Sequence, residues 1–516
     1  MCATLLQQSL HHKNILILFY PNPKGEYNCL PYPLLYLERA LKDINIKVVI
    51  IDERFDNNLL GFVDAHKDAI IAVGFSVILG YQVVSTVDYS QKIKSKYPDI
   101  PIIWGGAFVN WAPQTCIAED YIDYIITGQG EYVLKELVAN LISDSDMVLS
   151  EIAGLGFKKE GRVSVNRLQH YFNPFLLPEI NYNLIDLQHY VENGSLHYIA
   201  SVGCSHFCNF CFVSQTWKGR CFSNSAENII RDIKYFLSKE PSIKYLALDD
   251  TNFFTHKETV FDFCKKLNEN NINLNWCGTT RISEFLQLYD ENDLKKLRIA
   301  GCDTIYAGAE SGDEKVLKAL NKKLTVKEII LFNERVSQAG IKPSLSFMVL
   351  FPDAPMADLK KTLQLIMQLK YDAPQMVFTM NAYIPMRKNI YYFKALKLDY
   401  KFPRQMAAIV DGINKSFEMP WHNKEQFRIL NQFSEYYFRF SNPVYYKEMP
   451  KQQRWFYSII NKTAYPFIRY RFKHNSLRFR IDAVIFLFFI NIFEFFFKAP
   501  NKTNQKNYMT PRAKNF

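Results

Sequence analysis

Two successive alternations of apolar runs and helix-like stretches organise most of this chain. In the first alternation, apolar runs such as 14–19 (NILILF) and 70–75 (IIAVGF) are separated by helix-like stretches such as 82–96. Continuous apolar runs of this length predict strands that are buried on both faces, and helical crossovers between them predict a parallel, doubly wound α/β sheet. The predicted strands are 14–19, 46–51, 70–75, 101–104 and 123–126, and the predicted helices are about 33–43, 82–96 and 131–142.

The carboxyl ends of these predicted strands carry small residues. Ser76 follows the third strand, Gly105 and Gly106 follow the fourth, and Gly128 and Glu131 follow the fifth. Ligands of open parallel sheets bind beyond the carboxyl ends of the strands, and glycine lets the backbone approach a bulky ligand closely. Ordinary tight turns explain each glycine as well when it is taken alone.

A second alternation begins near residue 196, after a connector over 151–195 that has few long apolar runs. Six strand–helix units in succession predict a barrel or part of one, a partial (β/α)6 TIM-like barrel whose active site lies at the strand carboxyl ends. The predicted strands are 197–202, 244–248, 273–277, 303–307, 343–349 and 375–380, and the predicted helices are about 226–239, 257–270, 289–298, 325–338 and 356–369.

From about residue 389 the sequence becomes aromatic and basic and loses strand alternation, which predicts a mostly helical C-terminal cap. The expected organisation is an N-terminal Rossmann-like, flavodoxin-like domain over 14–150, the connector over 151–195, and the barrel over 196–388. The helical region with its basic tail occupies 389–516, and we expect residues 498–516 to fray.

Composition and charge narrow the function classes. Hydrophobic residues make up 48% of the 516 and charged residues 22%, which is a globular balance. Residues 451–516 contain thirteen Lys and Arg and two acidic residues, so the remaining chain is neutral overall and a nucleic-acid surface is not expected. All ten cysteines precede residue 303 and no apolar run precedes Asn14, so we expect a reducing, cytoplasmic location without disulfides.

The strongest local motif is GCSHFCNFC over 203–211, directly after the first predicted barrel strand. It contains Cys204, Cys208 and Cys211 in a C-x3-C-x2-C spacing. Thiolates this close in a loop can converge on one soft metal centre, and three ligands leave one iron of a four-iron cluster open. Zinc is the main alternative, with His206 as a fourth ligand, although structural zinc sites usually use paired C-x2-C units.

This motif resembles that of the radical S-adenosylmethionine superfamily, in which an aromatic residue such as Phe210 commonly precedes the third cysteine. LDDTNFF (248–254), WCGTTR (276–281) and the segment that begins AGCDTIYAGAESG (300–312) also match that family in order along the chain. The resemblance implies a [4Fe-4S] cluster on the three cysteines, with S-adenosylmethionine bound at the open iron. The residues that it implies for holding S-adenosylmethionine are Glu310 and Ser311, with Gly308 allowing close approach, and more weakly Arg281 and Asp250.

The first part of the chain resembles the cobalamin-binding domain of one branch of that superfamily. The matching stretches are PYPLLYLERAL, VGFSVILGYQ, IIWGGAF and TGQGEYVLKEL. By this resemblance Ser76, Gly105, Gly106, Gly128 and Glu131 line the corrin and its tail. Cobalamin methyltransferases that bind cobalt through a histidine carry D-x-H-x-x-G after the first strand, and this chain does not. His66 is therefore expected to be a surface histidine, and cobalt is expected to lack a protein histidine, as is usual in the radical branch.

Two loops depart from the family pattern and leave the substrate open. Leu350-Phe351-Pro352 replaces the usual G-x-P after the fifth barrel strand, and residues 383–387 (YIPMR) lack the Gly-Thr of P-x-P-G-T after the sixth.

The apolar run 483–497 is interrupted by Asn491 and Glu494, is too short to span a bilayer, and follows a basic stretch. We weigh peripheral contact of this C-terminal tail with an anionic membrane against a helix packed on the barrel.

The resemblance implies a radical S-adenosylmethionine enzyme that methylates an unactivated carbon or phosphorus centre of a small, apolar or aromatic substrate. A deoxyadenosyl radical would abstract a substrate hydrogen, methylcobalamin would supply the methyl group, and flavodoxin or ferredoxin would supply electrons. Radical cyclisation or oxidation without methyl transfer is the alternative within enzymes. A cobalamin sensor or electron carrier is the alternative in another class, and the AGAESG segment argues against it.

Overall fold

The computed structural model describes residues 13–23, 28–143, 148–168, 171–352, 355–385, 390–415, 419–441, 447, 451, 453–476 and 480–496. They fall into two compact units. The first unit takes its residues from Met1–Ser205, Thr216–Ala247 and Lys401–Phe417, and the second from His206–Gln215, Leu248–Tyr400 and Glu418–Phe516.

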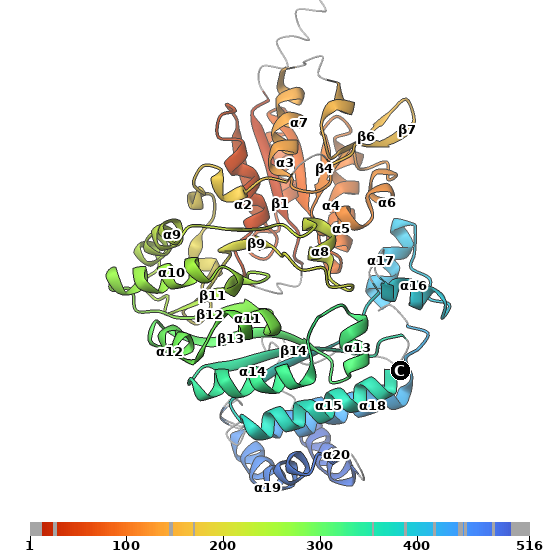
Figure 1. The fold of residues 1–516 in the computed structure, drawn as a ribbon. Coiled ribbons are helices and arrows are strands. Elements are labelled where there is room, and N and C mark those ends of the chain that lie inside the picture. Colours follow the sequence, from red (N-terminus) through yellow and green to blue (C-terminus); the bar gives the residue numbers. More distant parts are fainter. Residues whose placement is uncertain are drawn as a thin grey trace, which may run out of the picture. The chain divides into compact units, whose positions relative to one another are not determined.

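The first unit is built on a seven-stranded sheet in the order β2-β1-β3-β4-β5-β6-β7. Its first five strands are parallel, and the expected doubly wound arrangement is confirmed (Figure 1). Every residue of β1 and β3 is buried, which explains why their sequences are continuous apolar runs. The strands are β1 (Ile15–Tyr20), β2 (Lys47–Asp52), β3 (Ile70–Ser76), β4 (Ile102–Gly105), β5 (Tyr124–Ile126), β6 (Leu155–Lys159) and β7 (Arg162–Val165).

Helices cover both faces of this sheet. Leu34 of α2 and Leu134 and Leu137 of α7 share one apolar core with Leu16 and Leu18 of β1, so α2 and α7 lie on the same face. The other helices of this part of the unit complete the crossovers. The helices are α2 (Tyr32–Ala40), α3 (Leu59–His66), α4 (Tyr81–Lys96), α5 (Ala107–Trp111), α6 (Pro113–Ile117) and α7 (Glu131–Ser143).

Two parts of the first unit were not expected from the sequence. The predicted connector contains the hairpin of β6 and β7, which extends the sheet by antiparallel pairing with β5. Further along the chain, α17 (Met406–Lys415) belongs to this unit and packs against α4. The ring of Phe402 lies 4.3 Å from that of Trp111, which anchors the returning segment.

The second sheet has six strands in the order β15-β14-β13-β12-β11-β8, an open half-barrel as the six strand–helix units predicted. The predicted strand 197–202 is wrong in detail, because only β8 joins this sheet. Residues 201–203 form a separate strand that pairs antiparallel with residues 221–223. The strands are β8 (Ser195–Tyr198), β9 (Ser201–Gly203), β10 (Cys221–Ser223), β11 (Tyr245–Leu248), β12 (Asn275–Thr280), β13 (Cys302–Glu310), β14 (Lys342–Val349) and β15 (Val377–Ala382).

The strands of the second sheet alternate with helices, and a mostly helical region follows, as predicted (Figure 1). In that region α19 packs against α15 within the second unit. The α-helices are α8 (Phe212–Trp217), α9 (Ala226–Lys239), α10 (Lys257–Glu269), α11 (Ile282–Leu288), α12 (Glu291–Ile299), α13 (Glu314–Ala319), α14 (Val326–Gln338), α15 (Pro355–Asp372), α16 (Ile390–Leu396), α18 (Lys424–Gln432), α19 (Arg454–Lys473) and α20 (Ile481–Phe496).

Candidate functional site

The three motif cysteines lie in one short loop between β9 and α8. None of the three forms a disulfide, and each residue is half-buried. The backbone N–H of Cys204 donates to the carbonyl of Arg220 at 3.0 Å, and the N–H of Cys211 donates to the carbonyl of Cys208 at 3.2 Å. Ser214 donates its hydroxyl to the carbonyls of Cys208 and Cys211, at 3.2 and 2.8 Å. Hydrogen bonds of the backbone therefore hold the conformation of this loop.

Among the described residues, no group of three or more His, Cys, Asp or Glu side chains is placed to hold one metal ion. His206, the fourth ligand that a zinc site would need, instead lies 3.2 Å from a carboxylate oxygen of Glu284. A four-iron cluster takes each thiolate on a different iron, so its ligands stand farther apart than those of one zinc ion. The donor set of three thiols fits such a cluster.

The second part of the cysteine loop is bound to residues 319–321, at the C-terminal end of α13. Asn209 donates through its backbone N–H to the carbonyl of Leu320 at 2.9 Å and through its amide to that of Ala319 at 3.0 Å. Asn321 donates in turn to the carbonyl of Phe207 at 2.8 Å. Three hydrogen bonds thus attach the part of the loop around Cys208 to the C-terminal end of α13, although about a hundred residues separate them in the chain.

Arg281 contacts a cysteine of the loop directly. Its Nη1 lies 2.8 Å from the sulfur of Cys208, and the residue is only 7% exposed. A buried guanidinium donates a charge-assisted hydrogen bond, which a thiolate accepts better than a thiol. Hydrogen bonds to ligand sulfurs are also a main means by which proteins tune iron–sulfur clusters. Arg281 therefore contacts a sulfur of the cysteine loop in the structure, and its role in binding S-adenosylmethionine stays a prediction.

Glu310 forms a buried ion pair that the sequence did not predict. Its carboxylate accepts a hydrogen bond from Lys322 Nζ at 2.6 Å, and the side chains are only 7% and 9% exposed. The ammonium of Lys322 also lies 5.8 Å from the ring centre of Phe210, within the cation–π range. Lys322 thus connects the aromatic residue of the cysteine loop with the glutamate that ends β13.

The backbone at Glu310 is held in an uncommon conformation. Its φ is +65°, a region that residues other than glycine rarely adopt, and such strain often accompanies functional sites. Gly308 makes the ion pair possible, because a Cβ there would lie 2.1 Å from a carboxylate oxygen of Glu310 and 2.7 Å from Lys322 Nζ. The absent side chain of Gly308 therefore accommodates the pair.

Ser311 is fully buried, and its hydroxyl donates to the carboxylate of Asp358 in α15. The next residue is fixed in the same way, since the N–H of Gly312 donates to the hydroxyl of Thr362 at 2.8 Å. These bonds attach the loop to α15. Ser311 is thus fixed beside Glu310, and its predicted role in binding S-adenosylmethionine stays a prediction.

Asp250 is buried at the carboxyl end of β11, with 4% of its surface exposed, and its carbonyl accepts a hydrogen bond from Thr279 of β12. Glu284 of α11 is the centre of a polar cluster that includes Asn252 and Thr255, which follow β11. Burial alone would raise the pKa of Glu284, but hydrogen bonds from His206, Asn252 and Thr255 outweigh it and lower that pKa to about 2. Glu284 is therefore an ionised structural partner of the cysteine loop.

In the first unit, the structure brings the predicted small residues to the carboxyl ends of neighbouring strands. Ser76 and Gly105 are directly paired in the sheet. Gly106 has a φ of +95°, and a Cβ there would lie 2.8 Å from the backbone N and O of Val77. The carbonyl of Gly105 accepts from the N–H of Val77 at 2.8 Å. The backbones of the loops after β3 and β4 therefore pack directly against each other. Because Gly105 and Gly106 have no side chains, they add no bulk at this edge of the sheet.

Asn110 is a positioning residue that the sequence analysis missed. Its amide donates to the carbonyl of Gly106 at 3.1 Å, and its side-chain oxygen accepts from the N–H of Gly128 at 2.6 Å. It thereby connects the loops after β4 and β5. No sequence signal distinguishes it, because an asparagine in a short helix is ordinary. This edge of the sheet is rich in glycine and its loops are connected by hydrogen bonds, which fits a large planar cofactor such as a corrin.

Glu131 begins α7 and is buried, with 7% of its surface exposed. Burial raises the pKa of its carboxyl, while backbone hydrogen bonds and the charge of Arg39 act in the opposite direction. His66 lies at the end of α3, where its Nδ1 is 3.0 Å from the carbonyl of Phe62. It is thus not at the carboxyl ends of the strands, as expected for a histidine that does not ligate cobalt.

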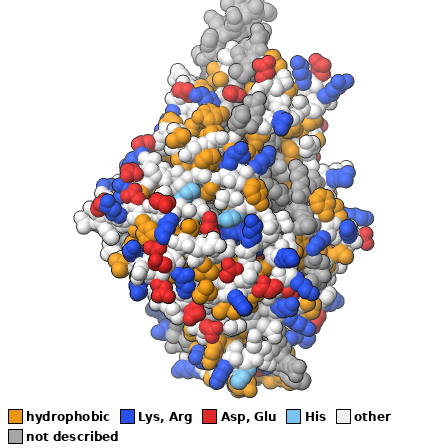
Figure 2. Space-filling model, viewed as in Figure 1, with side chains coloured by type: hydrophobic (Ala, Val, Ile, Leu, Met, Phe, Trp, Pro, Cys, Tyr) orange, Lys and Arg blue, Asp and Glu red, His pale blue; other side chains and the backbone are white. Residues whose placement is uncertain are grey.

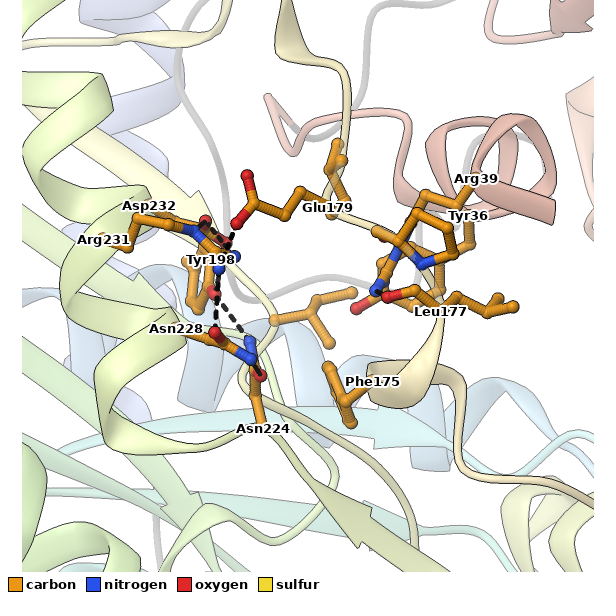
Figure 3. A pocket seen from close by; sticks show the side chains of 13 residues that line it. Tyr36, Arg39, Phe175, Leu177, Glu179, Tyr198, Asn224, Asn228, Arg231 and Asp232 are labelled. Carbon is orange, nitrogen blue, oxygen red and sulfur yellow. Dashed lines mark hydrogen bonds and ion pairs between the residues drawn. The ribbon is translucent and has the colours of Figure 1, made fainter. Parts of the chain in front are cut away.

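A separate cavity of about 230 Å³ lies in the first unit beside α2 and α9 (Figure 3). Its charged side chains are already engaged. Arg39 donates to the carbonyls of Leu177 and Pro178, and the carboxylate of Asp232 accepts from the hydroxyls of Tyr182 and Tyr198 at 3.1 and 2.9 Å. This network fastens the connector to the helices and does not by itself indicate a ligand.

Comparison of the sequence with known protein families identifies the class of protein to which this fold and this cysteine loop belong. Residues 198–366 match the radical SAM superfamily, and residues 24–138 match the B12-binding domain. The chain belongs to the cobalamin-dependent radical SAM enzymes, whose cofactors are a [4Fe-4S] cluster, S-adenosylmethionine and cobalamin. The recognition made from the motifs is thereby confirmed.

Relatives of different activity are similar to this chain. An uncharacterised methyltransferase of Pyrococcus horikoshii is 23% identical over 352 residues, which cover 67% of this chain and 74% of that protein. The anaerobic magnesium-protoporphyrin IX monomethyl ester cyclase of Synechocystis is 24% identical over 326 residues, 60% of this chain and 63% of the cyclase. This chain thus spans about three quarters of one relative and less than two thirds of the other.

Two solved structures share the fold. The cobalamin-dependent radical enzyme OxsB, with aqua-cobalamin bound, has a TM-score of 0.65 at 17% identity and covers 98% of this chain and 79% of its own. The radical S-adenosylmethionine methyltransferase TsrM from Kitasatospora setae, with tryptophan and a SAM analogue bound, has a TM-score of 0.61 at 17% identity, with 75% and 76% covered. These similarities concern the fold.

Proposed function

We propose that this enzyme transfers a methyl group to an unactivated carbon or phosphorus centre of a small-molecule substrate. The observation that carries the proposal is the attachment, by three hydrogen bonds, of the Cys208 loop to residues 319–321. The next residue, Lys322, forms the buried ion pair with Glu310. These contacts connect Cys208 and a buried carboxylate within the second unit. The B12-binding domain in the same chain supports methyl transfer, because cobalamin is a methyl carrier.

In this proposal, Cys204, Cys208 and Cys211 hold the cluster, and Arg281 donates to one of its ligand sulfurs. Glu310, oriented by Lys322, binds S-adenosylmethionine. When bound, these cofactors supply radical hydrogen abstraction and methyl donation, and the protein contributes orientation and exclusion of water. We propose that a small electron carrier such as flavodoxin or ferredoxin reduces the enzyme.

In the first unit, the cobalamin site of this proposal is the edge formed by Ser76, Gly105, Gly106, Gly128 and Glu131. Asn110 keeps two of its loops in place through its bonds to Gly106 and Gly128. The contribution of these residues is shape: a carboxyl-end edge with glycine backbone that a planar macrocycle can approach.

The test is the identification of small-molecule products by mass spectrometry. Protein reconstituted with cluster and cobalamin is incubated anaerobically with a strong reductant and S-adenosylmethionine labelled with deuterium on its methyl group. Deoxyadenosine together with S-adenosylhomocysteine, and a labelled methyl group on a candidate substrate, is the expected result. Cys208→Ala protein is the control, and deoxyadenosine formation at an unchanged rate from it contradicts the assignment of the cluster.

Radical cyclisation or oxidation is a second candidate, and the similarity to the cyclase of Synechocystis favours it. The same experiment separates the two reactions. A substrate converted with deoxyadenosine formation, but without S-adenosylhomocysteine or label transfer, would assign cyclisation or oxidation and exclude methyl transfer for that substrate.

A further inference from the structure

The C-terminal helices of the second unit expose an unusually apolar surface. In α20 every large apolar side chain of one face is exposed, and Phe488 has 61% of its surface in contact with water. In α19 the exposed apolar side chains include Trp455 and Tyr470. We call this the α19–α20 surface; it consists of Trp455, Ile459, Phe467, Tyr470, Ile481, Val484, Ile485, Phe488, Phe489 and Ile492.

Helix geometry shows that these residues form one continuous face of each helix. In α20 they recur at intervals of three and four residues, which places them on one side. The opposite side carries Ala483, Ile490 and Phe493, which are buried. Phe493 stacks on Phe456 of α19 at 3.7 Å between ring centres, so the two helices pack together and both expose an apolar face. A large contiguous patch of exposed apolar side chains usually marks a site of interaction with another protein or a membrane.

Basic side chains border this surface. Lys462, Arg469 and Lys473 are exposed on α19, on the flank of its apolar stripe. Arg471 is different, since it forms a bidentate pair with Asp482 at 2.6 and 2.9 Å and so holds α19 against α20. At the lower end of Figure 2, where α19 and α20 lie in Figure 1, blue side chains border orange ones.

The charge balance points to an anionic partner. Residues 451–516 carry a net charge of +11, whereas the rest of the chain is neutral. Asp482, the acidic side chain at the start of α20, is neutralised by Arg471. A surface that combines an apolar centre with cationic margins matches the interface of a bilayer that contains anionic lipids.

The helices are suited to lie in a membrane interface. No described helix is both long and apolar enough to cross a bilayer. The 16 residues of α20 span about 24 Å, against a hydrocarbon core of about 30 Å. We propose that the α19–α20 surface docks on an anionic phospholipid bilayer, with both helices parallel to the membrane plane and their exposed aromatic and aliphatic side chains inserted.

The test is flotation of the full-length, reconstituted enzyme with phospholipid vesicles. Vesicles of phosphatidylcholine and phosphatidylglycerol are compared with phosphatidylcholine alone, at low and high salt. We expect the protein to float with the anionic vesicles and to be released by salt. The triple variant Ile485→Asn, Phe488→Asn, Phe489→Asn should lose more than tenfold in affinity, because each inserted side chain contributes apolar burial. These side chains are exposed, so the fold should tolerate the change.

Matched control variants distinguish binding through the α19–α20 surface from non-specific adsorption of the protein to vesicles. Ile299→Asn with Leu331→Asn removes exposed apolar side chains elsewhere in the second unit and should leave flotation unchanged. Lys462→Gln and Lys473→Gln should each weaken binding to anionic vesicles about fivefold, whereas Lys265→Gln, on the exposed side of α10, should not. Light scattering on the same samples reports the mass of the free protein.

Three results would overturn the proposal. The first is an absence of flotation with anionic vesicles. The second is flotation that the triple variant and its control reduce equally. The third is a dimer that the triple variant converts to a monomer while flotation is absent, which would assign the surface to a second copy of the chain.

Discussion

The buried pair of Lys322 and Glu310 gives the sharpest prediction about the site. Lys322→Met removes the ammonium 2.6 Å from the carboxylate and leaves Glu310 as a charge with 7% of its side chain exposed. Breaking one partner of such a pair typically costs about 3–5 kcal/mol, because the remaining charge is buried without compensation. Replacing both partners by uncharged groups is much less costly, so Lys322→Met with Glu310→Gln should recover most of the stability.

The assay is urea unfolding of the cluster-free protein, followed through the transition that includes the second unit. The expected pattern is a loss of about 3–5 kcal/mol for Lys322→Met. In the double-mutant cycle the coupling energy should have the opposite sign, because the double variant loses less stability than the two single variants together. Binding of S-adenosylmethionine to the reconstituted Lys322→Met enzyme should weaken while its iron content stays unchanged. A loss below about 1 kcal/mol, the usual value for an exposed pair, would refute the reasoning.

Three further predictions concern the cluster, the cobalamin edge and pH. Cys208→Ala should lose most of its iron and its iron–sulfur absorbance after anaerobic reconstitution, whereas Cys264→Ala, in α10, should lose neither. Gly106→Ala should weaken cobalamin binding about tenfold in a spectroscopic titration, since a Cβ meets Val77 and the backbone φ is positive. Gly161→Ala, equally strained but with open space at its Cβ, should not. Burial lowers the pKa of His422 to about 4, although a backbone hydrogen bond with Leu350 acts in the opposite direction. The unfolded chain therefore binds a proton at this residue more readily than the folded protein does. The second unit should lose roughly 1–2 kcal/mol of stability, discounted for solvent screening, as pH falls from 6.5 towards 4. His422→Phe should abolish this dependence in urea titrations, and an unchanged slope would contradict it.

Much of the fold could be predicted because burial dictates the pattern. β1 is apolar at every position, and β3 is apolar up to its last residue, Ser76, since helices cover both faces of the sheet. This pattern is directly visible in the sequence. The hairpin of β6 and β7 was missed because its residues are partly exposed and the pattern is mixed, although Lys159-Glu160-Gly161-Arg162 carries a turn signal. The return of 401–417 to the first unit has no local signal, because it depends on the tertiary contact between Phe402 and Trp111.

The candidate site shows the same division between local and tertiary information. The cysteine spacing and the glycines are local patterns, so they are visible in the chain. The role of Lys322 could not be predicted from the sequence, because its partner Glu310 is twelve residues away. A lysine at a helix end is also usually solvated. Asn110 is similar, since its importance comes from two loops that only the folded sheet brings together.

The contacts of Ser311 and Lys322 together explain how a strained glutamate is maintained. The φ of +65° at Glu310 is unfavourable by itself, so neighbouring interactions must compensate for it. Ser311, the residue that follows Glu310, donates its hydroxyl to Asp358 of α15, and Lys322 donates to the carboxylate of Glu310. Asn209 and Asn321 then bind the same segment to the cysteine loop. A change at any of these positions therefore acts on Glu310 and on the cysteine loop at once, although only the cysteines carry a metal-ligand motif. This coupling predicts that the effects of variants at Asn209 and Lys322 on S-adenosylmethionine binding are not additive, because both act through one loop arrangement.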